Sequence, residues 1–210
     1  MRKIAVFDLD HTILSTDSFI DYVIFMLTKY PLKLFYLPYL SLLLVLKVIG
    51  IIKFEYFKSK WLLFFKGINI DEIENNSKKF CDNLIRKNVK KGALDEIERL
   101  RKSGFELVLA TASFEFYVKY IFEYLRFDHL FGTKVLYDDK RRIIPEIDGK
   151  NCKALEKISR ITSVINKNDI DRINSTGYSD CKSDLFFLEI TGTFNLVAKK
   201  QWKIIKEYKN

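Results

Sequence analysis

The 210-residue chain is 48% hydrophobic and 30% charged, which excludes a disordered protein and allows one core domain with a small insert. Its net charge of +9 fits an anionic partner, such as nucleic acid, an acidic membrane surface or a phosphorylated substrate. The basic residues are scattered among apolar ones and form no nucleic-acid-binding motif, so we expect no nucleic-acid partner. Three widely spaced cysteines without a paired spacing argue against a zinc centre and indicate a reducing compartment.

The N-terminal run Ile4–Phe7 predicts a short buried parallel strand, and Asp8 and Asp10 follow it directly. The run is too short to be a signal-peptide core, so we expect the chain to begin in the cytoplasm. Open α/β sheets place their ligands at the carboxyl ends of strands, where these two acids would lie. Buried carboxylates so close together need a shared cation or proton. The alternative is a pair of solvated loop acids, with Asp10 capping a helix.

Residues 18–66 are crowded with large apolar and aromatic side chains, with lysines between them. The uncharged part, residues 34–46, contains Pro38 and is shorter than the roughly 20 apolar residues that span a bilayer. Three interpretations remain open: buried packing within a helical insert, an interfacial element that contacts the membrane, and a dimer surface. Alternating apolar and basic blocks are typical of the interfacial elements.

The rest of the chain alternates between patterns of helices and strands. Amphipathic helices are predicted at 71–86 and 92–102, the second ending at Gly104. Further strands are expected at 105–110, 133–137, 172–178 and 194–198, and further helices at 114–125, 153–161 and from 183. This alternation predicts an α/β fold with a Rossmann-like parallel sheet. Because the apolar stretch interrupts it early, we expect a catalytic core of residues 1–16 and 88–210 and a helical cap of residues 17–87.

Polar residues recur at the other predicted strand ends and helix starts. Thr111 and Ser113 follow the second strand, where hydroxyls can hold a phosphate oxygen or merely cap the next helix. Lys153, with Lys150 as a rival, could supply a point charge for phosphate. Asp180 and Asp184 follow a later strand and could hold Mg²⁺ or form a capping loop. Together these groups supply a nucleophile, an acid/base, a metal site and phosphate-binding residues.

The order of these motifs resembles the haloacid dehalogenase superfamily over nearly the whole chain. The matching positions are Asp8, Asp10 and Thr12, then Thr111, then Lys153, then Asp180 and Asp184. The resemblance implies that Asp8 attacks phosphorus to form an aspartyl-phosphate and that Asp10 is the acid/base. It implies Mg²⁺ held by Asp8, Asp10 and Asp180, and a phosphoryl group held by Thr111, Ser113, Lys153 and Leu9. Asp184, Thr12 and Asp17 would have supporting roles.

The position of the insert is similar to that in the phosphoserine-phosphatase-like branch of the superfamily. Tyr30-Pro31-Leu32, Leu37-Pro38 and Gly177-Tyr178-Ser179-Asp180 resemble the phosphatidylglycerophosphatase C family, which implies a lipid phosphate substrate and peripheral contact with the inner membrane face. The alternative is a soluble amino-acid, amino-alcohol or sugar phosphate, with Asp17 facing a substrate amine. A minor alternative is a non-catalytic, membrane-associated binding protein.

Overall fold

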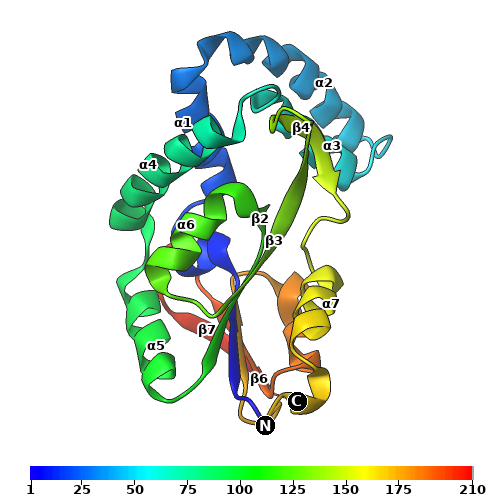
Figure 1. The fold of residues 1–210 in the computed structure, drawn as a ribbon. Coiled ribbons are helices and arrows are strands. Elements are labelled where there is room, and N and C mark those ends of the chain that lie inside the picture. Colours follow the sequence, from blue (N-terminus) through cyan, green and yellow to red (C-terminus); the bar gives the residue numbers. More distant parts are fainter. Residues whose placement is uncertain (210) are drawn as a thin grey trace.

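The computed structural model, which describes residues 1–209, has a seven-stranded sheet in the order β4-β3-β2-β1-β5-β6-β7 (Figure 1). The five inner strands are parallel, whereas β4 and β7 pair antiparallel at the two edges. The strands are β1 (Ile4–Phe7), β2 (Glu106–Phe114), β3 (His129–Tyr137), β4 (Ile143–Asp148), β5 (Thr176–Ser179), β6 (Thr193–Val197) and β7 (Ile204–Lys209). The predicted α/β fold is confirmed.

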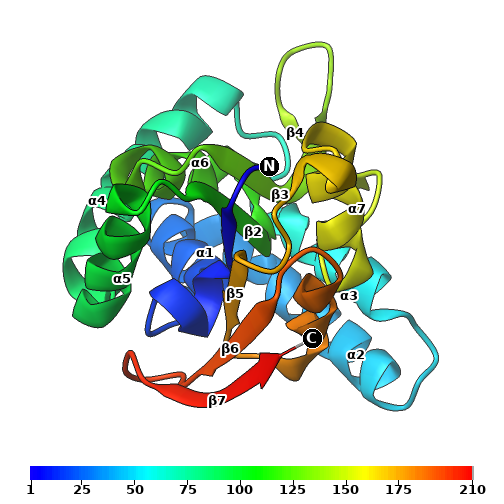
Figure 2. The same ribbon diagram turned by 90° about the horizontal axis from the view of Figure 1, so that it is seen from below.

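Both faces of the sheet are covered, which explains why β1 and residues 107–110 of β2 are continuous apolar runs. Successive side chains point to opposite faces, so Ala5 and Phe7 join one buried cluster while Ile4 and Val6 join another. Helices α5 (Lys91–Lys102) and α6 (Glu115–Leu125) cover the first face, and α7 (Leu155–Val164) covers the second (Figure 2). Gly104 adopts a φ of +76° just after α5, in agreement with its predicted role as a helix stop.

The sequence patterns did not predict the two edge strands, β4 and β7. β4 contains Pro145 and has only one buried residue, and β7 (Ile-Ile-Lys-Glu-Tyr-Lys) includes three charged residues and has no buried residue. Neither therefore has the apolar run that marks a buried strand. Proline and charged residues are common on edge strands, because the outer row of backbone groups needs no partner there.

The segment between β1 and α5 is helical and lies at the end of the sheet away from both termini (Figure 1). Its elements are α1 (Ser18–Lys29), α2 (Leu37–Val48), α3 (Phe54–Lys60), α4 (Ile70–Asn88) and the short 3₁₀ segments Pro31–Tyr36 and Trp61–Phe64. α4 runs down beside α6, where the Cys81 thiol lies 3.3 Å from the carbonyl oxygen of Tyr117. The β3–β4 hairpin reaches up to residues 67–70 and hydrogen-bonds to their backbone.

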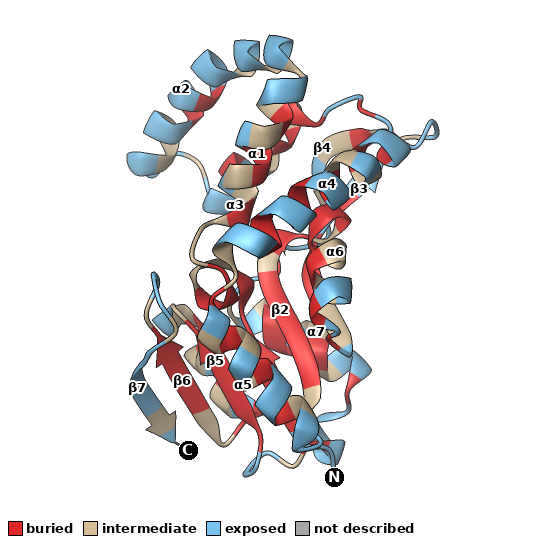
Figure 3. Ribbon diagram, turned by 90° about the vertical axis from the view of Figure 1, so that its left-hand side faces the viewer, coloured by how far each residue is buried: buried red, intermediate tan, exposed pale blue. Residues whose placement is uncertain are grey.

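The outer surface of this helical segment is unusually apolar. In α2 only Leu40 and Leu43 are buried, whereas Leu42, Val45 and Val48 are 57%, 56% and 70% exposed (Figure 3). Within residues 1–209, Pro31–Val48 is the one helical segment whose length and composition would allow it to cross a membrane, and 11% of it is buried. The interpretation as ordinary buried packing therefore does not fit α2.

Candidate active site

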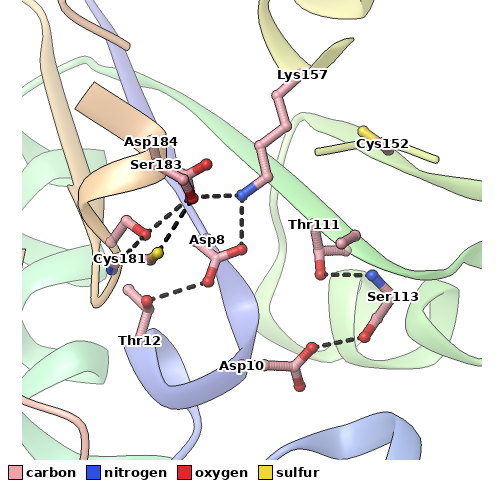
Figure 4. A network of polar contacts seen from close by, with 12 residues as sticks. Asp8, Asp10, Thr12, Thr111, Ser113, Cys152, Lys157, Cys181, Ser183 and Asp184 are labelled. Atoms are coloured by element: carbon pink, nitrogen blue, oxygen red, sulfur yellow. Dashed lines mark hydrogen bonds and ion pairs between the residues drawn. The ribbon is translucent and has the colours of Figure 1, made fainter. Parts of the chain in front are cut away.

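Three neighbouring central strands bring the predicted site residues together. Asp8 follows β1, Thr111 lies in the last part of β2, and Asp180 follows β5. Because β2, β1 and β5 are adjacent and parallel, their carboxyl ends meet at one edge of the sheet. Figure 4 shows Asp8 and Thr111 with the side chains around them.

Asp8 lies in a buried ion-pair network with Lys157 and Asp184. The Lys157 ammonium is 2.7 Å from Asp8 Oδ1 and 2.7 Å from Asp184 Oδ2, and all three side chains are nearly inaccessible to solvent (Figure 4). Burial raises the pKa of Asp8 to about 7, because Lys157 offsets only part of the desolvation and Asp184 adds repulsion. For Lys157, burial lowers the pKa, but the two carboxylates outweigh it and raise the value overall.

Thr12 connects Asp8 to Asp180 from the loop that follows β1. Its hydroxyl lies 3.2 Å from Asp8 Oδ2 and 3.4 Å from Asp180 Oδ1, and it accepts a hydrogen bond from the Asp180 backbone N–H. Two carboxylates therefore converge on one hydroxyl. Ser179 donates to Asp184 Oδ2, which fixes the second carboxylate of the β5 loop against Lys157.

Asp10 points to the other side of the site and is held by two donors. Its carboxylate accepts hydrogen bonds from the Ser18 backbone N–H at 2.7 Å and from the Ser113 hydroxyl at 2.5 Å. Thr111 Oγ1 accepts from the Ser113 N–H, so the predicted hydroxyl pair forms one local unit. Burial raises the pKa of Asp10, and the nearby Asp17 raises it further, so this carboxyl group is suited to hold a proton.

The structure corrects the prediction that Lys153, or its rival Lys150, is the lysine beside the nucleophile. α7 begins at Leu155 rather than at residue 153, and Lys157 in its first turn reaches Asp8. Lys153 instead lies with its ammonium 5.1 Å from the centre of the Phe54 ring. A sequence signal existed: Lys157 lies four residues before the fully buried Ile161, on the inward face of an amphipathic helix.

Asp17 and Leu9 occupy less central positions. Asp17 caps α1 by accepting hydrogen bonds from the Phe19 and Ile20 N–H groups, both at 3.0 Å. The Leu9 side chain is fully buried in the main core cluster, so only its backbone could face a ligand. Asp17 also borders a cavity of about 310 Å³ beside Asp10, together with Phe19, Ile20, Phe54, Phe57, Lys58, Trp61, Ala112, Ser113 and Lys153.

The donor set beside Asp8 fits a magnesium ion. Mg²⁺ prefers oxygen ligands and is commonly held by one or two carboxylates plus waters and substrate phosphate. Asp8 and Asp180 supply two such carboxylates, and both lie against the Thr12 hydroxyl. Within residues 1–209, no three His, Cys, Asp or Glu side chains form a complete metal cage.

Comparisons with curated proteins extend this picture. The protein CicA, in two strains of Caulobacter vibrioides, is 30% identical over 127 residues. That alignment covers 60% of this chain and 56% of CicA, so the chain matches little more than half the length of its curated relatives.

Solved structures with the same fold include a Bordetella pertussis protein of unknown function, which is 24% identical with a TM-score of 0.74 over 90% of this chain and 86% of that one. A phosphoserine phosphatase trapped as a phospho-aspartyl intermediate analogue is 18% identical, with a TM-score of 0.62 over 92% and 85% of the two chains. Residues 5–189 match the family described as haloacid dehalogenase-like hydrolase. The chain therefore belongs to the haloacid dehalogenase-like hydrolases and has the fold of the phosphatases among them.

Proposed function

We propose that the protein is a magnesium-dependent phosphatase that hydrolyses a phosphate monoester through a covalent aspartyl-phosphate on Asp8. The observation that carries the proposal is the division of labour between two buried carboxylates. Asp8 is paired with Lys157 and shares the Thr12 hydroxyl with Asp180, whereas Asp10 borders a cavity and accepts hydrogen bonds from the Ser18 N–H and the Ser113 hydroxyl. Two acids in different environments are typical of a nucleophile and an acid/base.

In the proposed reaction, an Asp8 carboxylate oxygen forms a bond to phosphorus while the bond from phosphorus to the alcohol oxygen breaks. Asp10 donates its proton to the departing oxygen, and then takes a proton from the water that attacks phosphorus and releases Asp8. The Lys157 ammonium offsets the negative charge of the phosphoryl group and of Asp8. A magnesium ion held by Asp8, Asp180 and the Asp10 carbonyl would supply further positive charge there.

The first test is phosphate release with Mg²⁺ from two sets of substrates. One set is phosphatidylglycerophosphate in detergent, and the other is phosphoserine, phosphoethanolamine and several sugar phosphates. Magnesium-dependent release from either set supports the phosphatase. Release that is unaffected by a chelator, or no release from any ester, would count against it.

Thr12 offers a test of the proposed metal site. Because its hydroxyl touches both Asp8 and Asp180, Thr12→Val should misorient the two carboxylates. Loss of such a supporting contact commonly costs about tenfold or more in metal affinity. We expect a correspondingly weaker Mg²⁺ affinity by calorimetry and in the magnesium dependence of phosphate release. An unchanged affinity would place the ion elsewhere.

For the substrate, we propose a lipid phosphate reached at a membrane surface. The support is α2, which packs against the rest of the chain through Leu40 and Leu43 but exposes its other apolar residues. A transmembrane helix is surrounded by lipid, whereas α2 packs along one side against the protein. Such a helix fits better in the plane of the membrane interface. Lys47 lies in the last turn of α2, and a basic residue there suits anionic head groups.

The membrane proposal predicts that polar substitutions on α2 weaken binding to vesicles. Replacing Leu42 and Val45 together by serine should reduce partition to anionic lipid vesicles about tenfold or more, because each side chain would lose apolar contact. The matched control is Ile173→Ser, which alters an apolar residue of 85% exposure outside α2. Cosedimentation measures the effect. If the double variant binds vesicles as well as the Ile173→Ser control does, a soluble ester becomes the favoured substrate.

A further inference from the structure

Two lysines, Lys58 and Lys153, line the cavity beside Asp10. Lys58 extends from α3, is only 9% exposed, and donates hydrogen bonds of 2.5 Å to the Ala112 carbonyl and to Asn151 Oδ1. Lys153 reaches the same cavity from the loop before α7. Within residues 1–209, no carboxylate oxygen lies within 4.0 Å of either ammonium group. Lys153 is exposed, but Lys58 is buried, and a buried cation without an ionic partner is costly unless an anion joins it.

The acids that share this cavity already have donors of their own. Asp10 accepts hydrogen bonds from the Ser18 N–H and the Ser113 hydroxyl, and Asp17 accepts two backbone N–H groups at the start of α1. The positive end of the α1 dipole further compensates Asp17. Burial lowers the pKa of the Lys58 ammonium overall, although Asp10 and Asp17 attract it and raise that pKa, so the charge of Lys58 is only partly compensated.

The cavity lies on the leaving-group side of the proposed reaction. It is bordered by Asp10 and Ser113, whereas Asp8 and Lys157 are not among its lining residues. Since Asp10 is assigned to protonate the departing oxygen, the alcohol released must extend into this cavity. Aromatic side chains, including Phe57 and Trp61, form its other wall and limit water, which strengthens charge interactions.

We propose that Lys58 and Lys153 bind a second anionic group on the leaving alcohol, so that the preferred substrate is a phosphate monoester that also carries a phosphodiester or second phosphate. This inference rests on the proposed phosphatase function. Lys58 uses two of its three N–H donors on protein oxygens, and the third is available for the anion. Burial lowers the pKa of Lys58 to about 8, and an anion in the cavity would favour its charged form.

The test compares kcat/KM for three esters. Glycerol 3-phosphate carries one anionic group, the deacylated head group of phosphatidylglycerophosphate carries two, and the intact lipid in detergent adds acyl chains. We expect the soluble two-anion ester to be preferred over glycerol 3-phosphate by about tenfold or more, and Lys58→Gln and Lys153→Gln each to reduce that preference about tenfold. Lys153→Arg should retain most of it. Lys60→Gln is the matched control, because Lys60 lies on α3 outside the cavity.

An unchanged preference in both glutamine variants would overturn the proposal, as would a preference for the lipid that its soluble head group does not share. Should Lys58→Gln fail to fold, Lys153→Gln decides, because the Lys153 side chain makes no hydrogen bond within residues 1–209. If the esters are hydrolysed but the preference for the two-anion ester does not depend on the lysines, the phosphatase function is supported and the anion site is wrong.

A binding measurement tests the anion site independently of the proposed phosphatase activity. Glycerophosphoglycerol is a phosphodiester without a monoester, so it can occupy the leaving-group cavity but cannot be a substrate for Asp8. Calorimetry with the Asp8→Asn protein should show binding that weakens about tenfold in Lys153→Gln. If this binding is found while no ester is hydrolysed by the unaltered protein, the anion site stands and the phosphatase function fails. If the diester does not bind, the anion site is overturned.

Discussion

Asp8→Asn should fold normally and lose phosphate release by about 10⁴-fold or more, because an amide oxygen does not form the aspartyl-phosphate. The Lys157 ammonium keeps its second partner, Asp184, at 2.7 Å, so the buried cation is not left alone. Phosphate release at saturating substrate measures the loss, and thermal unfolding checks the fold. Asp139→Asn is the matched control, because Asp139 is exposed.

Full activity in Asp8→Asn would remove Asp8 as the nucleophile. If the variant loses activity and yet its role in the cell persists, the protein acts by binding rather than by catalysis. The same variant therefore distinguishes the enzyme from a non-catalytic, membrane-associated binding protein.

Lys157→Met should destabilise the protein by about 3–5 kcal/mol, because it leaves two buried carboxylates without their shared cation. Urea unfolding measures this loss, and phosphate release should fall with it. Lys150→Met is the matched control, since Lys150 is exposed in the loop before α7 and was a candidate for the same role. We expect that control to lie within about 0.5 kcal/mol of the unaltered protein.

A second substitution shows whether the destabilisation arises from the charges. Adding Asp184→Asn to Lys157→Met removes one of the two stranded carboxylates, so the double variant should be less destabilised than the sum of the single variants. Strict additivity of the two losses would mean that Lys157 stabilises the protein by packing and not through its ion pairs.

Much of the sheet could be predicted because its central strands are buried on both faces. The apolar runs of β1 and of residues 107–110 in β2 end at conspicuous polar residues. Asp8 was assigned in this way and Asp180 from the acids that follow a later predicted strand, and the structure places both beside Thr12. Their roles in catalysis stay predictions until the variants are measured.

The lysine of the site was harder to find, because its position depends on where a helix begins. Ala154 adopts a φ of 51° just before α7, so the helix starts two residues later than the sequence pattern suggested. Lys58 was missed for a different reason. Its neighbours Ala112 and Asn151 are distant in sequence, and nothing in the basic, aromatic sequence around Lys58 indicates that this lysine is buried.

The β3–β4 hairpin limits how the helical segment can move. Backbone hydrogen bonds join Gly67 and Ile68 to Ile143, both at 3.3 Å, and Ile70 to Arg141 at 2.8 Å. A wide swing of the helices over the sheet would have to break these bonds while the chain is also tethered at both ends of the segment. These bonds restrain the helical segment that borders the cavity, whose lining includes the half-exposed Ile20 and Phe54. A restrained opening suits the proposed lipid substrate, because the head group could enter while the acyl chains stay outside.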